Sequence, residues 1–254
     1  MKKVLITGVA GEVGFPLCEN LLDLGVDVFG IDIPQERTSE RIDMIGRNAL
    51  FHFTPNKIEE VDWNTMEQTD VIYHFAQTYP ASNRFSELKE LIASHQRNIK
   101  NIVSFAEVNH TKVILLSTIE VYGNTYQQIT DDTKPSPTSL YGTIMLAEEN
   151  FLSEYSRVGD LDYVILRVPF VKKIAHPIEE HCRNIDRTEQ EKVSNQNMEF
   201  INGHTIEVQD LLHVLIAAGT TNNVKGIVPV PGQTTDNPSY SIKSTKFAEL
   251  SVHL

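Results

Sequence analysis

Short apolar runs rich in β-branched residues alternate along the chain with stretches in which apolar residues recur every three or four positions. The short runs predict buried strands at Val4–Ile6, Val28–Ile31, Val71–Phe75, Val113–Leu116 and Tyr163–Leu166. Strands that are apolar throughout are typical of a parallel sheet whose two faces are both covered by helices. The pattern therefore predicts an α/β fold built on a doubly wound parallel sheet.

Helical periodicity accounts for the segments between these strands. It predicts helices over residues 13–24, 88–106 and 208–218, and a further helix that begins near Ser139 or Tyr141. The last third of the chain is less regular. A late strand is expected at Ile227–Val230, and Gly232–Ser244 is rich in turn formers. Residues 172–204 are polar, and we expect them to be partly irregular.

Composition narrows the classes of function. The chain has 254 residues, enough for one sizeable core or for a core with a small appendage. Its formal net charge of −12 argues against nucleic acid as a partner, because phosphate backbones are bound by basic surfaces. The two cysteines, Cys18 and Cys182, and the nine scattered histidines show no metal-binding or disulfide spacing. The opening apolar run is too short for a signal peptide, and no stretch reaches the ~20 apolar residues of a membrane span. We expect a cytoplasmic protein without a metal or a membrane partner.

Three glycines directly after the first strand form the pattern Gly8-x-x-Gly11-x-x-Gly14, and a helix follows. Gly8 allows a tight turn, Gly11 lets the backbone approach a pyrophosphate, and Gly14 lets the helix pack closely on the strand. The start of that helix offers free N–H groups and the positive end of its dipole to phosphate. Asp32 ends the next strand, where a carboxylate is expected to accept hydrogen bonds from the adenosine ribose. The pattern predicts a Rossmann-type fold that binds NAD.

The carboxylate of Asp32 also repels a 2′-phosphate and so favours NAD over NADP. Two alternatives stay open. Arg37 could accept a 2′-phosphate, and a glycine turn beside a surface aspartate would bind no nucleotide at all. The cofactor contacts predicted in this part of the chain are Gly8, Ala10, Gly11, Glu12, Val13, Asp32 and Ile33.

Further motifs follow the glycine loop in order. They are Asp70–Gln77 on a strand, Asn98 in the long helix, Leu116–Gly123, Pro137–Gly142 and the pair Leu166-Arg167. Together with the loop, these segments resemble the extended short-chain dehydrogenase/reductase family, which contains nucleotide-sugar epimerases and dehydratases. The resemblance covers residues 1–170.

The resemblance implies an NAD-dependent oxidoreductase of the epimerase/dehydratase type that acts on a nucleotide-sugar or a related carbohydrate. It implies an NAD-binding Rossmann domain at 1–170 and a small, reduced substrate-binding region at 171–254 that partly returns to the Rossmann core. It assigns catalysis to Thr118, Glu120 and Tyr141. It adds as cofactor contacts Phe75, Ala76, Gln77, Asn98, Tyr141, Met145 and Pro169. In relatives, helices equivalent to 84–108 and 141–155 pair two subunits, so a homodimer is expected.

Three positions of the expected active site depart from the family pattern. The motif Y-x-x-x-K runs here from Tyr141 to Met145, so the lysine that binds the nicotinamide ribose and lowers the pKa of the tyrosine is absent. Ile119 replaces the acid that dehydratases carry beside Glu120, and Phe170 replaces a substrate-binding asparagine. Two functions therefore stay open. One is an enzyme with an atypical active site, in which another residue could take over the task of the lysine. The other is a catalytically silent NAD-binding sensor or scaffold.

Overall fold

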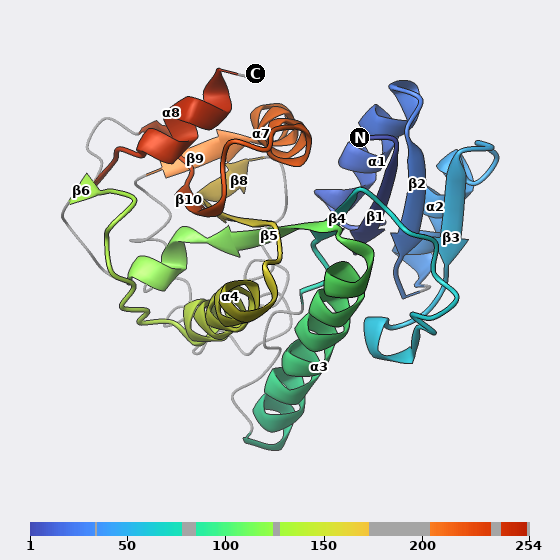
Figure 1. The fold of residues 1–254 in the computed structure, drawn as a ribbon, viewed down its shortest axis with the longest axis horizontal. Coiled ribbons are helices and arrows are strands. Elements are labelled where there is room, and N and C mark those ends of the chain that lie inside the picture. The colour runs from blue at the N-terminus through green and yellow to red at the C-terminus, as the bar shows by residue number, and fades with distance from the viewer. Residues whose placement is uncertain (34, 78–84, 124–127, 173–203, 235–239, 253–254) are drawn as a thin grey trace, which may run out of the picture.

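The computed structural model describes residues 1–254 apart from 34, 78–84, 124–127, 173–203, 235–239 and 253–254. A seven-stranded sheet forms its centre, in the order β10-β7-β5-β4-β1-β2-β3, and all neighbouring strands are parallel (Figure 1). The strands are β1 (Lys3–Thr7), β2 (Asp27–Ile31), β3 (Phe51–Thr54), β4 (Val71–His74), β5 (Lys112–Thr118), β7 (Tyr163–Val168) and β10 (Gly226–Pro229). The predicted parallel α/β sheet is confirmed.

The strand order reverses between β1 and β4. From β1 the chain builds β2 and β3 on one side, and then crosses to β4, β5 and β7 on the other. Thr7 at the end of β1 lies in register with Ile31 of β2 and with His74 of β4. The carboxyl ends of these three strands therefore meet at the point of reversal, which is where open parallel sheets bind their ligands.

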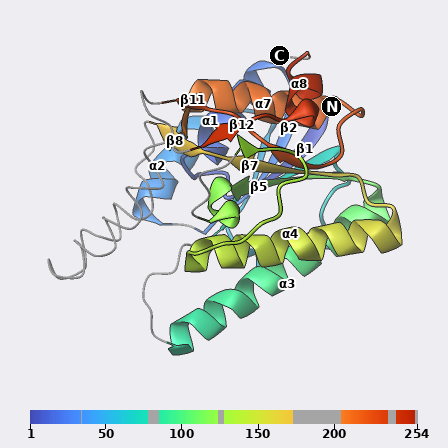
Figure 2. The ribbon, with the colours of Figure 1, turned by 90° about the vertical axis from the view of Figure 1, so that its left-hand side faces the viewer.

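Helices cover both faces of the sheet. They are α1 (Gly14–Asp23), α2 (Glu36–Ile45), α3 (Phe85–Asn109), α4 (Leu140–Gly159), α7 (Val208–Thr220) and α8 (Thr245–Ser251). α3 and α4 lie side by side against one face, and α1 and α7 lie against the other (Figure 2). Each pair buries apolar side chains on the sheet, including Ile99 and Leu152 on one face and Leu17 and Leu211 on the other.

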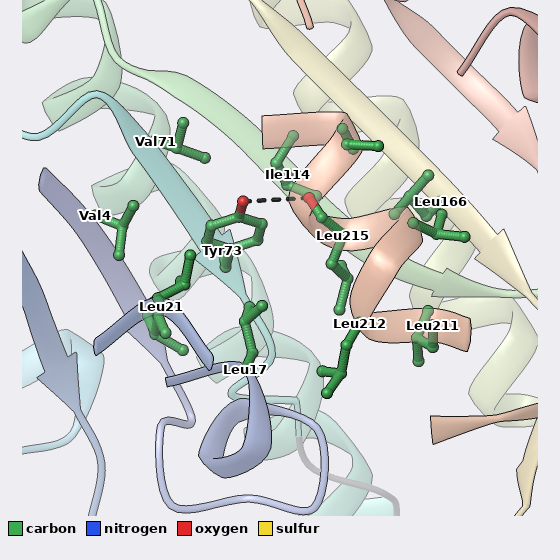
Figure 3. Close-up of a cluster of buried hydrophobic side chains, with 14 of the residues drawn as sticks. Val4, Leu17, Leu21, Val71, Tyr73, Ile114, Leu166, Leu211, Leu212 and Leu215 are labelled. Carbon is green, nitrogen blue, oxygen red and sulfur yellow. Dashed lines mark hydrogen bonds between the residues drawn. The ribbon is translucent and has the colours of Figure 1, made fainter. Parts of the chain in front are cut away.

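Tyr73 on β4 links the sheet to the later part of the chain. Its ring is fully buried between Leu17 and Leu21 of α1 and Leu212 of α7 (Figure 3). Its hydroxyl donates a hydrogen bond to the backbone carbonyl of Leu215 at 3.2 Å. A buried tyrosine needs such a partner for its hydroxyl, and this contact fixes α7 over the sheet.

Two small sheets and two single-turn helices complete the described fold. One sheet has the order β11 (Gln233–Thr234), β9 (His204–Glu207), β8 (Phe170–Lys172), and the other pairs β6 (Gln128–Ile129) with β12 (Ser241–Ile242). The 3-10 helices are η1 (Ile58–Glu60) and η2 (Ile119–Tyr122). β10 and α7, which both come after residue 171, join the main sheet and its core.

The strands and helices predicted from periodicity are present, with slightly different ends. The helix expected near Ser139 or Tyr141 is α4, and the Ser139 hydroxyl caps it by accepting a hydrogen bond from the N–H of Gly142. β3, α2 and α8 are additional, because β3 and α8 are short and α2 has only three apolar residues, Ile42, Met44 and Ile45. The predicted irregular segment 172–204 lies outside the described residues except at its two ends. None of the described helices is long and apolar enough to cross a membrane.

Candidate functional site

The glycine loop joins β1 to α1, and its packing leaves no room for larger residues. Gly8 has a φ of +73°, and a Cβ there would lie 2.8 Å from the backbone nitrogen of Ala76. A Cβ on Gly14 would lie 2.1 Å from the carbonyl oxygen of Gly8. These approaches hold the loop across the carboxyl ends of β1 and β4. Among the described residues no side chain caps α1 at Val13. Because the N–H of Phe15 is bonded to the carbonyl of Gly11 and Pro16 has no N–H, an anion at this end would be bound by the N–H groups that precede Phe15.

Asp32, which follows β2, lies against this loop. Its Oδ2 accepts a hydrogen bond from the N–H of Ala10, and its Oδ1 accepts one from the N–H of Ile33, both at 2.8 Å. Each oxygen can accept one more hydrogen bond, so the carboxylate can still receive ribose hydroxyls. Burial raises the pKa of Asp32, and the two backbone hydrogen bonds and Arg41 oppose that rise. The structure thus brings Asp32, Ala10 and Ile33 together at the loop.

Arg41 of α2 is a component of this site that the sequence analysis missed. Its guanidinium donates to the carbonyl oxygen of Ala10 at 2.8 Å and to Oε1 of Glu12 at 2.7 Å. The carboxylate of Glu12 lies at the end of α1 that attracts anions, and Arg41 compensates its charge. α2 was not predicted, so no signal placed Arg41 beside the loop. Nothing is described of the side chain of Arg37, which lies one turn earlier.

The segment after β4 passes directly beside the loop. Thr7 accepts a hydrogen bond through its carbonyl from the N–H of Phe75 at 3.0 Å, and its hydroxyl lies 2.7 Å from Nδ1 of His74. Phe75, Ala76 and Gln77 are all partly buried. The structure therefore places these three predicted cofactor contacts next to the glycine loop, on the side of β1 that is opposite to Asp32.

The three predicted catalytic residues come from η2 and from the start of α4. The hydroxyl of Thr118 accepts a hydrogen bond from the N–H of Glu120 at 3.2 Å and so caps η2. Ser139 donates its hydroxyl proton to Oε2 of Glu120 at 2.6 Å. Burial raises the pKa of Glu120, and the bond from Ser139 opposes that rise. Tyr141 lies two residues after Ser139, so this hydrogen bond ties η2 to the helix that carries the tyrosine.

Met145 is fully buried in an apolar cluster. The buried members of the cluster are Ile119, Val121, Tyr122, Ile129, Met145 and Tyr240. The ring of Tyr141 packs against it. Two of the three departures from the family pattern, Met145 and Ile119, therefore belong to one apolar unit beside the tyrosine.

A second buried polar group ties α4 to the sheet. Arg167 of β7 donates from Nη2 to Oε2 of Glu149 at 2.6 Å and lies over the ring of Tyr122, 4.7 Å from its centroid. The hydroxyl of Ser117 is hydrogen-bonded to the same carboxylate. All four residues are buried, so this group orients α4 and η2 relative to β5 and β7.

The remaining predicted contacts lie further from the loop. Asn98 is partly buried in α3, and within the described part of the chain its Oδ1 is buried without a hydrogen-bond partner. Pro169 is buried between β7 and β8, and Phe170 begins β8.

Cys18 is buried, which raises the pKa of its thiol to about 12. Among the described residues no group of His, Cys, Asp and Glu could hold a metal ion.

Comparison with protein families gives one match over most of the chain. The model of the NAD dependent epimerase/dehydratase family matches residues 4–171. A curated relative, the uncharacterized UDP-glucose epimerase YtcB of Bacillus subtilis, is 28% identical over 176 residues, which is 65% of this chain and 55% of YtcB. The D-erythronate dehydrogenase of Haemophilus influenzae is 28% identical over 182 residues, or 66% of this chain and 55% of that protein. The chain thus spans about half the length of the curated relatives it matches.

Solved structures share the fold. The UDP-glucuronic acid 4-epimerase of Bacillus cereus in complex with NAD superposes with a TM-score of 0.76 at 20% identity, covering 98% of this chain and 91% of that one. The UDP-N-acetylglucosamine 4-epimerase of Methanobrevibacter ruminantium M1 gives a TM-score of 0.76 at 16% identity, over 98% and 92% of the two chains. At these identities the likeness shows a common architecture.

Proposed function

Because the chain belongs to the NAD dependent epimerase/dehydratase family, we propose that it binds NAD at the glycine loop and acts on a nucleotide-sugar or related carbohydrate. Membership confirms the family resemblance seen in the sequence and supports NAD as the cofactor of the glycine loop. The substrate class rests on similarity to proteins such as the UDP-glucose epimerase named above.

A single observation carries the cofactor proposal: the Asp32 carboxylate accepts a hydrogen bond from the loop amide of Ala10 at 2.8 Å. One group thus borders both the loop, whose N–H groups suit a pyrophosphate, and the space beside β2 that suits a ribose. Because Gly8 and Gly14 have no Cβ, the loop backbone can pack closely on Ala76 and on itself. NAD, when bound, supplies the hydride acceptor for oxidation of a carbohydrate carbon.

The residues of the chain then have the following tasks in this proposal. Thr118 offers a hydroxyl to a sugar oxygen, and Tyr141 exchanges a proton with that oxygen. Glu120 is suited to exchange a second proton, because burial raises its pKa above the usual value of a glutamate and Ser139 holds it in place. An isolated tyrosine titrates near ~10, so without a cation at position 145 proton removal by Tyr141 is slow at neutral pH.

A catalytically silent NAD-binding protein is the second candidate. The observation in its favour is that Met145 and Ile119 are buried together in an apolar cluster, where the family pattern places a lysine and an acid. Such a protein would keep the cofactor site and lack turnover. In either case we propose a cytoplasmic homodimer that pairs through α3 and α4.

Calorimetric titration with NAD and NADP, followed by assay on a panel of UDP-sugars, tests these proposals. We expect NAD to bind more tightly than NADP, and Asp32→Ala to weaken NAD binding by about tenfold, the effect of one lost charged hydrogen bond. Asp27→Ala, at a position in β2 outside the loop, is the matched control. Wild-type protein that binds neither dinucleotide would refute the cofactor proposal. Binding without turnover on any sugar would favour the silent protein.

A further inference from the structure

A buried polar chain of three side chains joins β4, α4 and α3. Gln77, which follows β4, donates from Nε2 to the backbone carbonyl of Leu116 at 2.9 Å and to Oε2 of Glu148 at 3.2 Å. The other oxygen of that carboxylate, Oε1, lies 2.5 Å from Nδ1 of His95. Glu148 and His95 are only 3% and 5% exposed. Glu148 belongs to none of the motifs found in the sequence.

The partners determine which way the amide of Gln77 faces. A backbone carbonyl can only accept hydrogen bonds, and so can an ionised carboxylate. The nitrogen of the amide must therefore face Leu116 and Glu148, and both of its protons are engaged there. The amide oxygen, an acceptor, is the group that Gln77 can offer to another molecule. A hydrogen bond joins Nδ1 of His95 to Oε1 of Glu148 and holds that carboxyl group in place.

Burial of these hydrogen-bonded polar side chains costs free energy, and apolar side chains could fill the same space. A buried ion pair or polar network gives little net stability compared with well-packed apolar residues. It does fix one arrangement of its members, because each alternative leaves a buried polar atom without a partner. This cost in free energy is explained if the orientation of the Gln77 amide is needed for binding the cofactor.

Gln77 lies where the second half of a dinucleotide is expected. The loop and Asp32 lie at β1 and β2, and β4 is the neighbour of β1 on the opposite side. A dinucleotide bound at this reversal extends across the carboxyl ends of both sets of strands. With adenosine beside Asp32, the nicotinamide half passes over the segment after β4, where Gly8 packs on Ala76.

We propose that Glu148 and His95 are positioning residues: they hold the amide of Gln77, a cofactor contact implied by the family resemblance, so that its oxygen faces the nicotinamide half as a hydrogen-bond acceptor. The inference rests on the proposed NAD site. Met145 replaces the lysine that binds the nicotinamide ribose in the family. Gln77, held by Glu148 and His95, would supply a polar contact to the same half of the cofactor.

ADP and NAD together test the proposal, because ADP reaches the loop and Asp32 but not Gln77. We expect Gln77→Ala and Glu148→Ala to raise the Kd for NAD about tenfold, the effect of one oriented hydrogen bond, and to leave the Kd for ADP within twofold. Glu148→Gln should restore NAD affinity. Its amide oxygen can accept from Gln77, and neutral His95 can change tautomer to accept from its nitrogen. Glu154→Ala, on the exposed side of α4, is the control and should change neither Kd.

Three results would overturn the inference. Unchanged NAD affinity in Gln77→Ala would show that this side chain makes no contact with the cofactor. A parallel loss of NAD and ADP affinity in Glu148→Ala, or no rescue by Glu148→Gln, would show a purely structural role. Gln77 is only partly buried, so Gln77→Ala keeps the test decisive if Glu148→Ala does not fold. Wild-type protein that binds neither ligand would instead refute the NAD site itself.

Discussion

The hydroxyl of Ser139 makes two hydrogen bonds, and one of them donates to the carboxylate of Glu120 at 2.6 Å. In the other it accepts from the N–H of Gly142 at 3.0 Å and caps α4. The carboxylate most suited to proton exchange is therefore held by the residue that starts the tyrosine helix. Loss of the Ser139 hydroxyl would therefore remove both the cap of α4 and a hydrogen bond to Glu120.

Ser139→Ala is expected to lower the free energy of unfolding by ~1–3 kcal/mol, the sum of a helix cap and a hydrogen bond to a partly buried acid. Denaturant unfolding at neutral pH measures this loss. The loss should shrink near pH 4, because the hydrogen bond from Ser139 favours the ionised form of Glu120 and lowers its pKa. Ser139→Thr keeps the hydroxyl and should behave like wild type. An equal loss at both pH values would contradict the link to Glu120.

His74 makes stability depend on pH through its burial. Desolvation lowers the pKa of this fully buried histidine from 6.5 to about 4. Between these values the unfolded chain binds a proton that the folded chain does not, so stability falls as pH drops through this window. The full effect is ~3 kcal/mol, from about 1.4 kcal/mol for each unit of pKa. We expect His74→Asn to lose less stability than wild type between pH 7 and pH 4, measured by denaturant unfolding. The exposed His52, replaced in the same way, is the control. Parallel curves for wild type and His74→Asn would refute the prediction.

Much of the fold could be predicted from the sequence because its signals are local. Apolar runs such as Val4–Ile6 are buried on both faces, and the glycines after β1 are required by contacts within a few residues or with the adjacent strand. β3 and α2 could not be predicted. β3 is a four-residue edge strand, and α2 carries few apolar positions.

The parts of the site that the sequence analysis missed depend on pairs of residues far apart in the chain. Arg41 meets Glu12 only because α2 returns beside the loop. Glu148 meets His95 only because α3 and α4 pack together. Neither pair follows a periodicity or a motif. The three-dimensional arrangement alone shows that these charges are matched.

Arg41→Ala is expected to raise the Kd for NAD about tenfold, the effect of one charged interaction, because it removes the guanidinium that binds the carboxylate of Glu12 beside the proposed pyrophosphate site. The double variant Glu12→Gln/Arg41→Ala should bind NAD more tightly than Arg41→Ala alone, since it also removes the negative charge of Glu12 beside the pyrophosphate. Calorimetric titration of the four members of this cycle measures the coupling. Arg47→Ala, an exposed arginine just after α2, is the matched control. Additive effects of the two substitutions would show that the pair does not act as a unit.

Met145→Lys separates the two proposed functions. Met145 is fully buried among apolar residues, so an amine there should lower the melting temperature, because burial of an unpaired charge is unfavourable. Met145→Leu conserves volume and should cost less than ~1.5 kcal/mol, which makes it the control for packing. The lysine would also lie one turn after Tyr141, where a cation lowers the pKa of the phenol. If the chain is an enzyme limited by its tyrosine, turnover on its sugar should rise by ~10²-fold in Met145→Lys, the lower range of general acid–base effects. Turnover that is absent from both wild type and a folded, NAD-binding Met145→Lys variant would favour the silent protein.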